Sequence, residues 1–306
     1  MILCSGEALI DMLPRQSTEG ENVFAPYAGG AVFNTAIALG RLDVPTGFFS
    51  GLSTDLFGTL LAETLAASGV SSDHAHRSDR PTTLAFVTLT DGHASYAFYD
   101  ENTAGRMLTP DDLPILGDDV DAMFFGGISL MVEPCASAYE AFCLAEAPRR
   151  VTMLDPNIRP GFIRDADVYR ARVGRMIAVA DIVKLSDEDL AWLTGQDDID
   201  SGVASLLGKG PALICITRGS EGVTGYTSAG ATHVPANKVE VVDTVGAGDT
   251  FNAGLLAALH DAGALTKDKV RALDPDTIRG ALALGAAAAA VTVSRAGANP
   301  PTRAEL

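Results

Sequence analysis

A short glycine-rich segment in the C-terminal part of the chain combines open backbone amides with a carboxylate. It reads Asp243-Thr-Val-Gly-Ala-Gly-Asp249 and leads into an apolar run with helical spacing. Because Gly246, Ala247 and Gly248 have small side chains, their N–H groups would be open at a helix N-terminus, where phosphate groups and developing oxyanions bind. Asp249 would accept the proton of an attacking hydroxyl there. The segment predicts phosphoryl transfer to an alcohol, and the alternative is a glycine-rich turn with a capping acid.

The common nucleotide-binding signatures do not occur in this sequence. No G-x-G-x-x-G follows the first expected strand. The nearest approach to a P-loop, residues 202–210, has the wrong spacing and ends in Gly210 where Ser or Thr would stand. A P-loop and a standard dinucleotide-binding fold are therefore disfavoured.

Two signatures of one family are nevertheless present in order. The string Asp243-Thr-Val-Gly-Ala-Gly-Asp-Thr-Phe-Asn-Ala-Gly254 resembles the second signature of the ribokinase (phosphofructokinase B) family of carbohydrate kinases. Residues 28–42, which begin Ala28-Gly-Gly-Ala-Val-Phe-Asn34, resemble the first. The resemblance extends from the first strand to Pro301. It implies ATP as donor, a magnesium ion and a sugar hydroxyl as acceptor.

The resemblance also implies a role for each matching residue. Asp249 corresponds to the catalytic base, and Gly246, Ala247 and Gly248 correspond to the anion hole. The implied sugar-binding residues, with Arg106 as a lid contact, are Asp11, Gly29, Gly30, Asn34, Arg106 and Arg159. The implied ATP-binding residues are Asn157, Lys184, Thr217, Gly219 and Gly222. Structural alternatives are a strand-end acid for Asp11, a helix N-cap for Asn34 and a salt bridge for Arg159, and residues 217–222 also fit an ordinary hairpin turn.

The implied metal positions are less regular. Where the family usually has Asn and Glu after a lysine, this sequence has Ser186 and Asp189. Either Glu188 or Asp189 is therefore expected to hold magnesium through water, and a helix cap is the alternative reading of this segment. Asp243, Val245 and Gly297 resemble a monovalent-cation site of the family, so potassium dependence is a hypothesis.

Segments 95–106 and 128–134 resemble those of bacterial fructokinases within the family. In ketodeoxygluconate kinases an arginine follows the two lid aromatics and meets the substrate carboxylate, whereas this sequence has Asp100. An acid at this place disfavours an anionic substrate. The first expectation is fructose, phosphorylated at its terminal hydroxyl. The alternatives are a kinase for another sugar, ketodeoxygluconate or a nucleoside, and a non-catalytic nucleotide-binding regulator with the same fold.

Short β-rich runs alternate with longer segments of helical spacing, which favours a parallel sheet covered by helices. The expected strands are 1–3, 46–51, 122–126, 151–155, 181–185 and 212–217, and the expected helices are 34–42, 56–68, 134–147, 168–180, 247–262 and 277–293. The turn Thr90-Asp-Gly-His93 predicts a hairpin between two apolar runs. Together with the resemblance, this pattern predicts an α/β fold, a three-layer α/β/α ribokinase-like sandwich with a mostly parallel sheet. Residues 1–306 would form a single domain with a small β-sheet lid from about residues 12–30 and 82–106.

Composition limits the partners and the compartment. The 306 residues include 22 Lys and Arg against 39 Asp and Glu, and the net charge of −17 disfavours nucleic acid as a partner. The four cysteines lack C-x-x-C spacing and predict buried thiols of a reduced, cytoplasmic protein. The longest apolar tract, Ala281 to Val293, is shorter than the roughly 20 residues that cross a bilayer, so no membrane partner is expected. Apolar lid strands leave edges to protect, which predicts a homodimer through the lid.

Overall fold

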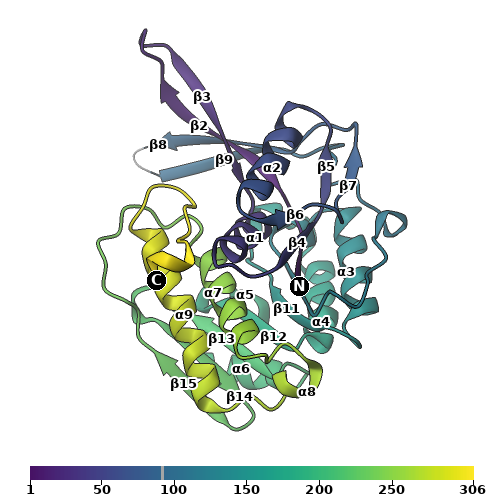
Figure 1. Cartoon of the computed structure of the whole chain (residues 1–306), viewed down its shortest axis with the longest axis vertical. Helices are drawn as coiled ribbons and strands as arrows, with labels where there is room; N and C mark the ends of the chain where they lie inside the picture. The colour runs from purple at the N-terminus through teal and green to yellow at the C-terminus, as the bar shows by residue number, and fades with distance from the viewer. Residues whose placement is uncertain (91–92) are drawn as a thin grey trace.

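A computed structural model describes residues 1–90 and 93–306 of the chain (Figure 1). A nine-stranded sheet forms the centre, and helices cover both of its faces. In spatial order its strands are β15 (Gly230–Val234), β14 (Val223–Thr227), β13 (Leu213–Thr217), β12 (Ile182–Ser186), β11 (Val151–Asp155), β10 (Ala122–Gly126), β1 (Ile2–Ser5), β4 (Thr46–Phe49) and β6 (Val70–Ser71). Neighbours from β13 to β6 are parallel, whereas β14 and β15 pair antiparallel at one edge. The predicted α/β class with a mostly parallel sheet is confirmed.

Every predicted helix is present, with ends that differ by a few residues. The α-helices are α1 (Ala31–Arg41), α2 (Leu56–Ala67), α3 (Cys135–Glu146), α4 (Ala166–Val179), α5 (Asp187–Thr194), α6 (Ile199–Leu207), α7 (Ala247–Asp261), α8 (Lys267–Val270) and α9 (Pro275–Val293). Short 3-10 turns are η1 (Pro110–Asp112), η2 (Ile128–Leu130), η3 (Pro160–Phe162), η4 (Gly219–Glu221) and η5 (Arg303–Glu305). The expected strand 46–51 is divided into β4 and β5 (Gly51–Ser53), and β5 pairs with β7 (His76–Ser78).

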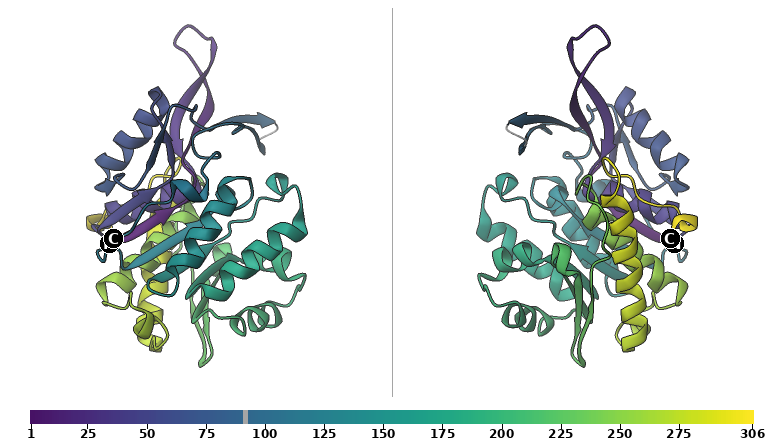
Figure 2. Two further views of the ribbon diagram at one scale, coloured as in Figure 1. Left: turned by 90° about the vertical axis from the view of Figure 1, so that its right-hand side faces the viewer. Right: turned by 90° about the vertical axis from the view of Figure 1, so that its left-hand side faces the viewer.

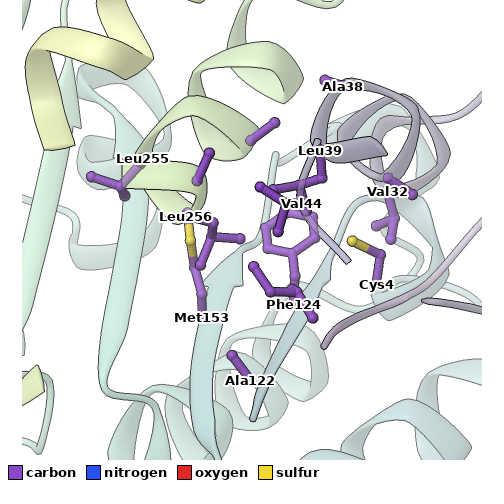
Figure 3. Packing of buried hydrophobic residues seen from close by; sticks show 14 of the residues in the cluster. Cys4, Val32, Ala38, Leu39, Val44, Ala122, Phe124, Met153, Leu255 and Leu256 are labelled. Carbon is purple, nitrogen blue, oxygen red and sulfur yellow. The ribbon is translucent and has the colours of Figure 1, made fainter. Parts of the chain in front are cut away.

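Side chains alternate across the central strands and form one apolar core on each face of the sheet. Ile2 and Cys4 of β1 pack into the cluster that includes α1, α2, α7 and α9, whereas Leu3 packs into the cluster with α3, α4, α5 and α6. Figure 3 shows part of the first cluster, in which Phe124 of β10 lies among side chains from α1 and α7. Because successive residues of a strand point to opposite faces, continuous apolar strands are what a sheet covered on both sides requires. The four cysteines are free and buried, as expected.

A separate four-stranded sheet projects beyond the central one (Figures 1 and 2). Its order is β3 (Asn22–Gly29), β2 (Leu9–Gln16), β8 (Leu84–Thr90) and β9 (His93–Tyr99). The predicted hairpin is therefore present as the antiparallel pair of β8 and β9, while Asp91 and Gly92 of its turn lie outside the described residues. The small sheet begins at Leu9, earlier than expected, because β2 continues from the turn after β1.

Helix α9 contains the longest apolar tract, residues 281–293, and extends beyond it. The helix has 19 residues, since it begins at Pro275 behind the N-cap Asp274, and by length and composition alone it passes the test for a membrane span. Its Gly285 packs closely on Phe251 of α7, and Ile278 and Leu282 are buried in the core. These contacts make it a helix that covers the sheet.

Candidate active site

Polar side chains, some of them predicted site residues, follow the carboxyl ends of the parallel strands. β1 ends just before Glu7, β11 ends at Asp155 just before Asn157, and β12 ends just before Glu188 and Asp189. In open α/β sheets this edge is where ligands bind, because the loops that follow the strands converge there. An open cavity of about 800 Å³ lies at this edge, between the central sheet and the small sheet. Its lining residues are Glu7, Leu9, Asp11, Gly30, Ala31, Phe98, Gly127, Ile128, Asn157, Arg159, Pro160, Gly161, Phe162, Thr244, Val245, Gly246, Ala247, Gly248 and Asp249.

The N-terminus of α7 faces this cavity. Gly246 is the N-cap residue with φ 78°, a left-handed conformation that favours glycine, and a Cβ on it would lie 2.8 Å from Cβ of Ala298. Among the described residues, no side chain caps the helix. The first-turn amides at Gly246, Ala247 and Gly248 therefore line the cavity with the positive end of the helix dipole behind them.

Asp249 is held in the first turn of α7 by contacts to α1. Its side chain is buried, yet it lines the cavity. Asn34 Nδ2 donates a hydrogen bond of 2.9 Å to Oδ2 of Asp249, and the hydroxyl of Thr35 donates to the Asp249 carbonyl at 3.2 Å. Burial raises the pKa of Asp249 to about 7, although the hydrogen bond from Asn34 opposes this. A carboxylate whose pKa lies near neutral pH suits a general base.

Asp11 faces the same cavity from β2. Burial raises the pKa of its carboxyl to about 6. A Cβ on Gly29 would lie 2.3 Å from Oδ2 of Asp11, so only glycine lets β3 approach this carboxylate. Gly30, with φ 109°, then starts the turn into α1. Base, anion hole and the predicted sugar-binding acid thus converge on one space.

A buried polar network lies beneath the anion hole. Lys184 Nζ is 3.0 Å from Oδ2 of Asp155, and Asn252 Nδ2 donates to the same oxygen at 2.7 Å. Burial alone would lower the pKa of Lys184, but the charge and hydrogen bond of Asp155 raise it. A Cβ on Gly248 would lie 3.0 Å from Nζ of Lys184. The Lys184 ammonium therefore lies behind the backbone of the anion hole, and it does not line the cavity.

The loop after β11 closes the cavity on the side of the small sheet. Asn157 has φ 43° and directs the chain so that Arg159 lines the cavity, where its guanidinium donates to the carbonyl of Ile158 at 3.0 Å. Phe162 of η3 meets Phe98 of β9 edge to face, with ring centroids 4.3 Å apart. This contact joins the small sheet to the loops of the central sheet.

Comparison with known proteins decides the family. The model of the pfkB family carbohydrate kinase matches residues 1–305. The chain belongs to this family of carbohydrate kinases. A fructokinase from Rhizobium leguminosarum bv. trifolii is 57% identical over 279 residues, which cover 91% of this chain and 86% of that protein.

Solved structures agree with the family and the fold. A fructokinase from Xylella fastidiosa with bound ATP has a TM-score of 0.86 and 31% identity, covering 97% of this chain and 93% of that one. A fructokinase double mutant from Vibrio cholerae O395 with fructose, ADP and a potassium ion has a TM-score of 0.85 and 26% identity, with coverage of 97% and 93%. The three-layer ribokinase-like fold is thereby confirmed, and this kinase transfers a phosphoryl group to a sugar hydroxyl.

The remaining predicted ATP-binding residues of this kinase lie on the neighbouring strand, outside the cavity lining. Thr217 ends β13, and its hydroxyl is 3.4 Å from the carbonyl of Leu185. Gly219 begins η4 and Gly222 follows its end, with φ values of 48° and 98°. A Cβ on Gly222 would lie 2.2 Å from the carbonyl oxygen of Val234, which explains glycine at this position without a ligand.

Arg106 is not among the residues that line the cavity, and its contact with the sugar stays a prediction. Its guanidinium forms an ion pair with Asp100 at 2.9 Å, and both side chains are 15% exposed. It also donates to the Glu133 carbonyl at 3.1 Å, beside a smaller hollow lined by Arg164 and Arg172. The opposite charge of Asp100 thus holds the Arg106 guanidinium beside this smaller hollow.

The two candidate magnesium carboxylates differ in their surroundings. Glu188 is exposed, whereas Asp189 is buried and accepts from the backbone N–H of Ile158 at 3.0 Å and of Ser186 at 3.4 Å. Ser186 in turn accepts from the N–H of Asp189, so the predicted helix cap is present. No group of three or more His, Cys, Asp or Glu side chains within residues 1–90 and 93–306 is placed to hold a metal ion. This donor set fits magnesium that arrives with ATP and keeps waters and phosphate oxygens as ligands.

Hydrogen bonds join the residues of the predicted cation site. The carboxylate of Asp243 accepts from the N–H of Val245 at 3.0 Å and from the N–H of Gly297 at 2.9 Å. These bonds bring the start of α7 and the turn after α9 together. Both carboxylate oxygens are engaged, so a cation here would be met mainly by carbonyl oxygens of the same turns.

Several cavity residues were not predicted from the sequence. Glu7, Gly127 and Phe162 line the cavity, and Glu7 is a buried acid in an apolar stretch. A buried acid beside a strand end is a signal that sequence reading can detect, since Glu is seldom buried without a partner. Gly127 and Phe162 carry no comparable signal, because their places depend on how the loops fold.

Proposed function

We propose that this kinase is a fructokinase that transfers the γ-phosphoryl group of ATP to the terminal hydroxyl of fructose, giving fructose 6-phosphate and ADP. One observation carries the proposal: Asp249, the amides of Gly246–Gly248 and Asp11 face one cavity. The similarity to fructokinases, one of them 57% identical, supports fructose as the acceptor.

In the proposed reaction Asp249 accepts the proton of the sugar hydroxyl as its oxygen forms a bond to the γ-phosphorus. The bond between that phosphorus and the bridging oxygen of ADP breaks, and ADP leaves with the electron pair. The N–H groups at the start of α7 stabilise the negative charge of the moving phosphoryl group, and the buried Lys184 adds positive potential beneath them. Magnesium, when bound with ATP, neutralises phosphate charge, and Asp189 or Glu188 would hold its waters.

We propose that the sugar binds on the side of the cavity formed by β2, the start of α1 and the loop after β11. Asp11 would accept hydrogen bonds from two sugar hydroxyls, because a carboxylate offers two acceptor oxygens. Gly29 and Gly30 let the backbone approach the sugar, and Asn34 holds the base. Arg159 lines the cavity with an exposed guanidinium that can meet the sugar or the transferring phosphate.

ATP would lie along the carboxyl ends of β11, β12 and β13. Asn157 lines the cavity. Thr217, Gly219 and Gly222 lie outside it, at the end of β13 and around η4. We propose that the phosphates run from this turn to the start of α7. Lys184 acts through its charge, since its ammonium is buried against Asp155.

We propose that residues 1–306 act as a single catalytic domain and that the small sheet is its lid, through which two copies form a homodimer. Exposed apolar side chains on its edge strands support the dimer: Val23, Phe24 and Tyr27 on β3 and Tyr99 on β9 are 38–62% exposed. Sedimentation showing a stable monomer would contradict the dimer. Four free thiols support a reducing, cytoplasmic location.

Potassium activation is a further part of the proposal. The joined turns at Asp243, Val245 and Gly297 support it, and a similar fructokinase structure contains a potassium ion. Replacing potassium by sodium at constant ionic strength should lower turnover. Equal rates in the two salts would remove this part of the proposal.

An acceptor panel tests the function. Purified protein is incubated with ATP and magnesium and with fructose, glucose, ribose, ketodeoxygluconate, adenosine or inosine, and products are identified by phosphorus NMR. Fructose 6-phosphate should form with the highest kcat/KM. Activity on a nucleoside or on ketodeoxygluconate but none on fructose would replace the substrate, and ATP binding without turnover of any acceptor would favour a non-catalytic regulator.

A further inference from the structure

We propose that Glu7 is a positioning residue that sets the place of α1, and through α1 the place and charge state of the base Asp249. The inference builds on the proposed kinase reaction, because it concerns the residue proposed as its base. No role for Glu7 was expected from the sequence motifs. Its surroundings in the structure suggest one.

The Glu7 carboxylate joins two loops at the edge of the cavity. Oε1 accepts from the N–H of Ala31 at 2.9 Å, and Oε2 accepts from the N–H of Ser129 at 3.2 Å. The side chain is only 9% exposed. Because each oxygen has a backbone donor of its own, the carboxylate ties the turn before α1 to the turn after β10.

The two turns are shaped around this carboxylate. A Cβ on Gly127, which has φ 70°, would lie 2.0 Å from Oε1 of Glu7. A Cβ on Gly30, which has φ 109°, would lie 2.9 Å from the Glu7 carbonyl oxygen. Glycine is therefore required on both sides of Glu7, which shows how closely the two loops approach it.

A short chain of contacts leads from Glu7 to the base. Ala31 is the first residue of α1, and Asn34 stands one turn later with its amide 2.9 Å from Asp249. The hydroxyl of Thr35 lies 3.1 Å from the Ala31 carbonyl and 3.2 Å from the Asp249 carbonyl. A displaced start of α1 would thus move the donors that fix Asp249.

Charge gives a second connection between the two acids. The groups that act on Asp249 come from four elements: Asn34 from α1, Asp155 from β11, Lys184 from β12 and Glu7 from the turn after β1. Asn34 and Lys184 lower the pKa of Asp249, whereas Asp155 and Glu7 raise it. Asp11 lines the same cavity wall. Loss of the Glu7 charge by itself should lower the pKa of Asp249, whereas displacement of Asn34 should raise it.

The experiment compares Glu7→Gln with Glu146→Gln in the full-length protein. Glu146 is 8% exposed and binds Arg149 and Arg150 at the end of α3, so its variant loses a buried charge outside the cavity lining. We expect Glu7→Gln to lower kcat by about 100-fold at saturating ATP, since small displacements of reacting groups cost about that much. The midpoint of its acid limb in kcat/KM should shift away from that of wild type. Glu146→Gln should lower the melting temperature and leave kcat and the pH profile unchanged.

Ala31→Pro provides a second variant in case Glu7→Gln does not fold. It deletes the N–H that binds Oε1 and puts a ring carbon in its place, at the first helical position, where proline is tolerated. It should lower kcat with a small change in melting temperature. A kcat within twofold of wild type in a folded variant of either kind, or a loss that merely follows the folded fraction, overturns the proposal.

A readout without turnover separates this inference from the proposed function. The carboxyl carbon of Asp249 is titrated by NMR in wild type and in Glu7→Gln, with Asp249→Asn to assign the signal. The midpoint in the variant should differ from that of wild type, lower where the lost Glu7 charge dominates and higher where the Asn34 hydrogen bond is weakened, and an equal midpoint contradicts the inference. If wild type phosphorylates no acceptor, the proposed function fails while this titration still decides the effect of Glu7.

Discussion

Asn34 and Asp249 are joined by one hydrogen bond of 2.9 Å, from Nδ2 to Oδ2, so the two sequence signatures meet at a single carboxylate. The donor favours the charged form of the acid, because it binds the carboxylate more strongly than the neutral carboxyl.

Asn34→Ala should raise the pKa of Asp249 and lower kcat/KM at pH 7 by about 10- to 100-fold, since a hydrogen bond to a charged group contributes roughly 1.5–3 kcal/mol. The acid limb of kcat/KM should move to higher pH. Asn299→Ala is the matched control, because Asn299 accepts from Arg41 at the other end of α1. An unchanged pH profile in Asn34→Ala would argue against the contact.

The pH dependence of the wild-type enzyme should show two acids. Asp249, with a pKa raised by burial to about 7, must be deprotonated to accept a proton, so kcat/KM should rise with pH through about 7. Asp11, raised by burial to about 6, should bind the sugar better as a carboxylate, so KM for the sugar should fall as pH rises through about 6. Asp11→Asn should remove the second dependence and keep the first. Steady-state kinetics between pH 5 and pH 9 measure both.

Asp249 should also lower the stability of the folded protein above neutral pH. Its pKa is about 7 in the folded protein and near 3.8 in the unfolded chain, so the folded state binds the proton more tightly and stability falls as pH rises between these values. Asp249→Asn should therefore raise the free energy of unfolding at pH 8 by an amount on the order of a few kcal/mol, which a higher melting temperature would report. The gain should be smaller at pH 5, and equal gains at the two pH values would contradict the burial of a charge.

Two glycines with different surroundings should respond oppositely to alanine. Gly246→Ala should lower both stability and kcat, because its φ is 78° and the new Cβ would lie 2.8 Å from Ala298. Gly280→Ala should raise stability by roughly 0.5–1 kcal/mol with unchanged activity, since Gly280 is an exposed residue of α9 with open space around it. Urea denaturation and initial rates check both. A stabilised Gly246→Ala would contradict the described turn.

Phe162→Ala should open the cavity on the side of the small sheet. Loss of its contact to Phe98 should raise KM for the sugar and increase ATP hydrolysis without sugar, because water enters more easily. Tyr99→Ala on the same strand is the control, since Tyr99 contacts Phe86 and is 62% exposed. If both variants behave as wild type, the contact has no role in closure.

The sequence predicts the regular secondary structure of this protein well. β10 and β11 begin and end at the predicted residues, because continuous apolar runs bounded by polar turns define buried strands. The helix cap at Ser186 is also confirmed, since capping depends on residues three apart in the chain. Local chemistry decides these features.

The parts that depend on tertiary approach were not predicted. Arg106 lies near the lid residues in sequence, but the charge of Asp100 holds it beside another hollow. Lys184 matches the family motif, yet its ammonium is buried in an ion pair with Asp155 behind the anion hole. Glu7 becomes informative only when its partners Ala31 and Ser129, far apart in the chain, are known. Which partner a charged side chain meets is set by the assembled loops.

The most direct measurement compares turnover and ATP affinity of wild type and Asp249→Asn with fructose as acceptor. The wild type should form fructose 6-phosphate. The variant should bind ATP with similar affinity by calorimetry and lose about 10²–10⁴-fold in kcat, the usual contribution of a general base. Turnover of Asp249→Asn close to that of the wild type would contradict Asp249 as the base and with it the proposed mechanism.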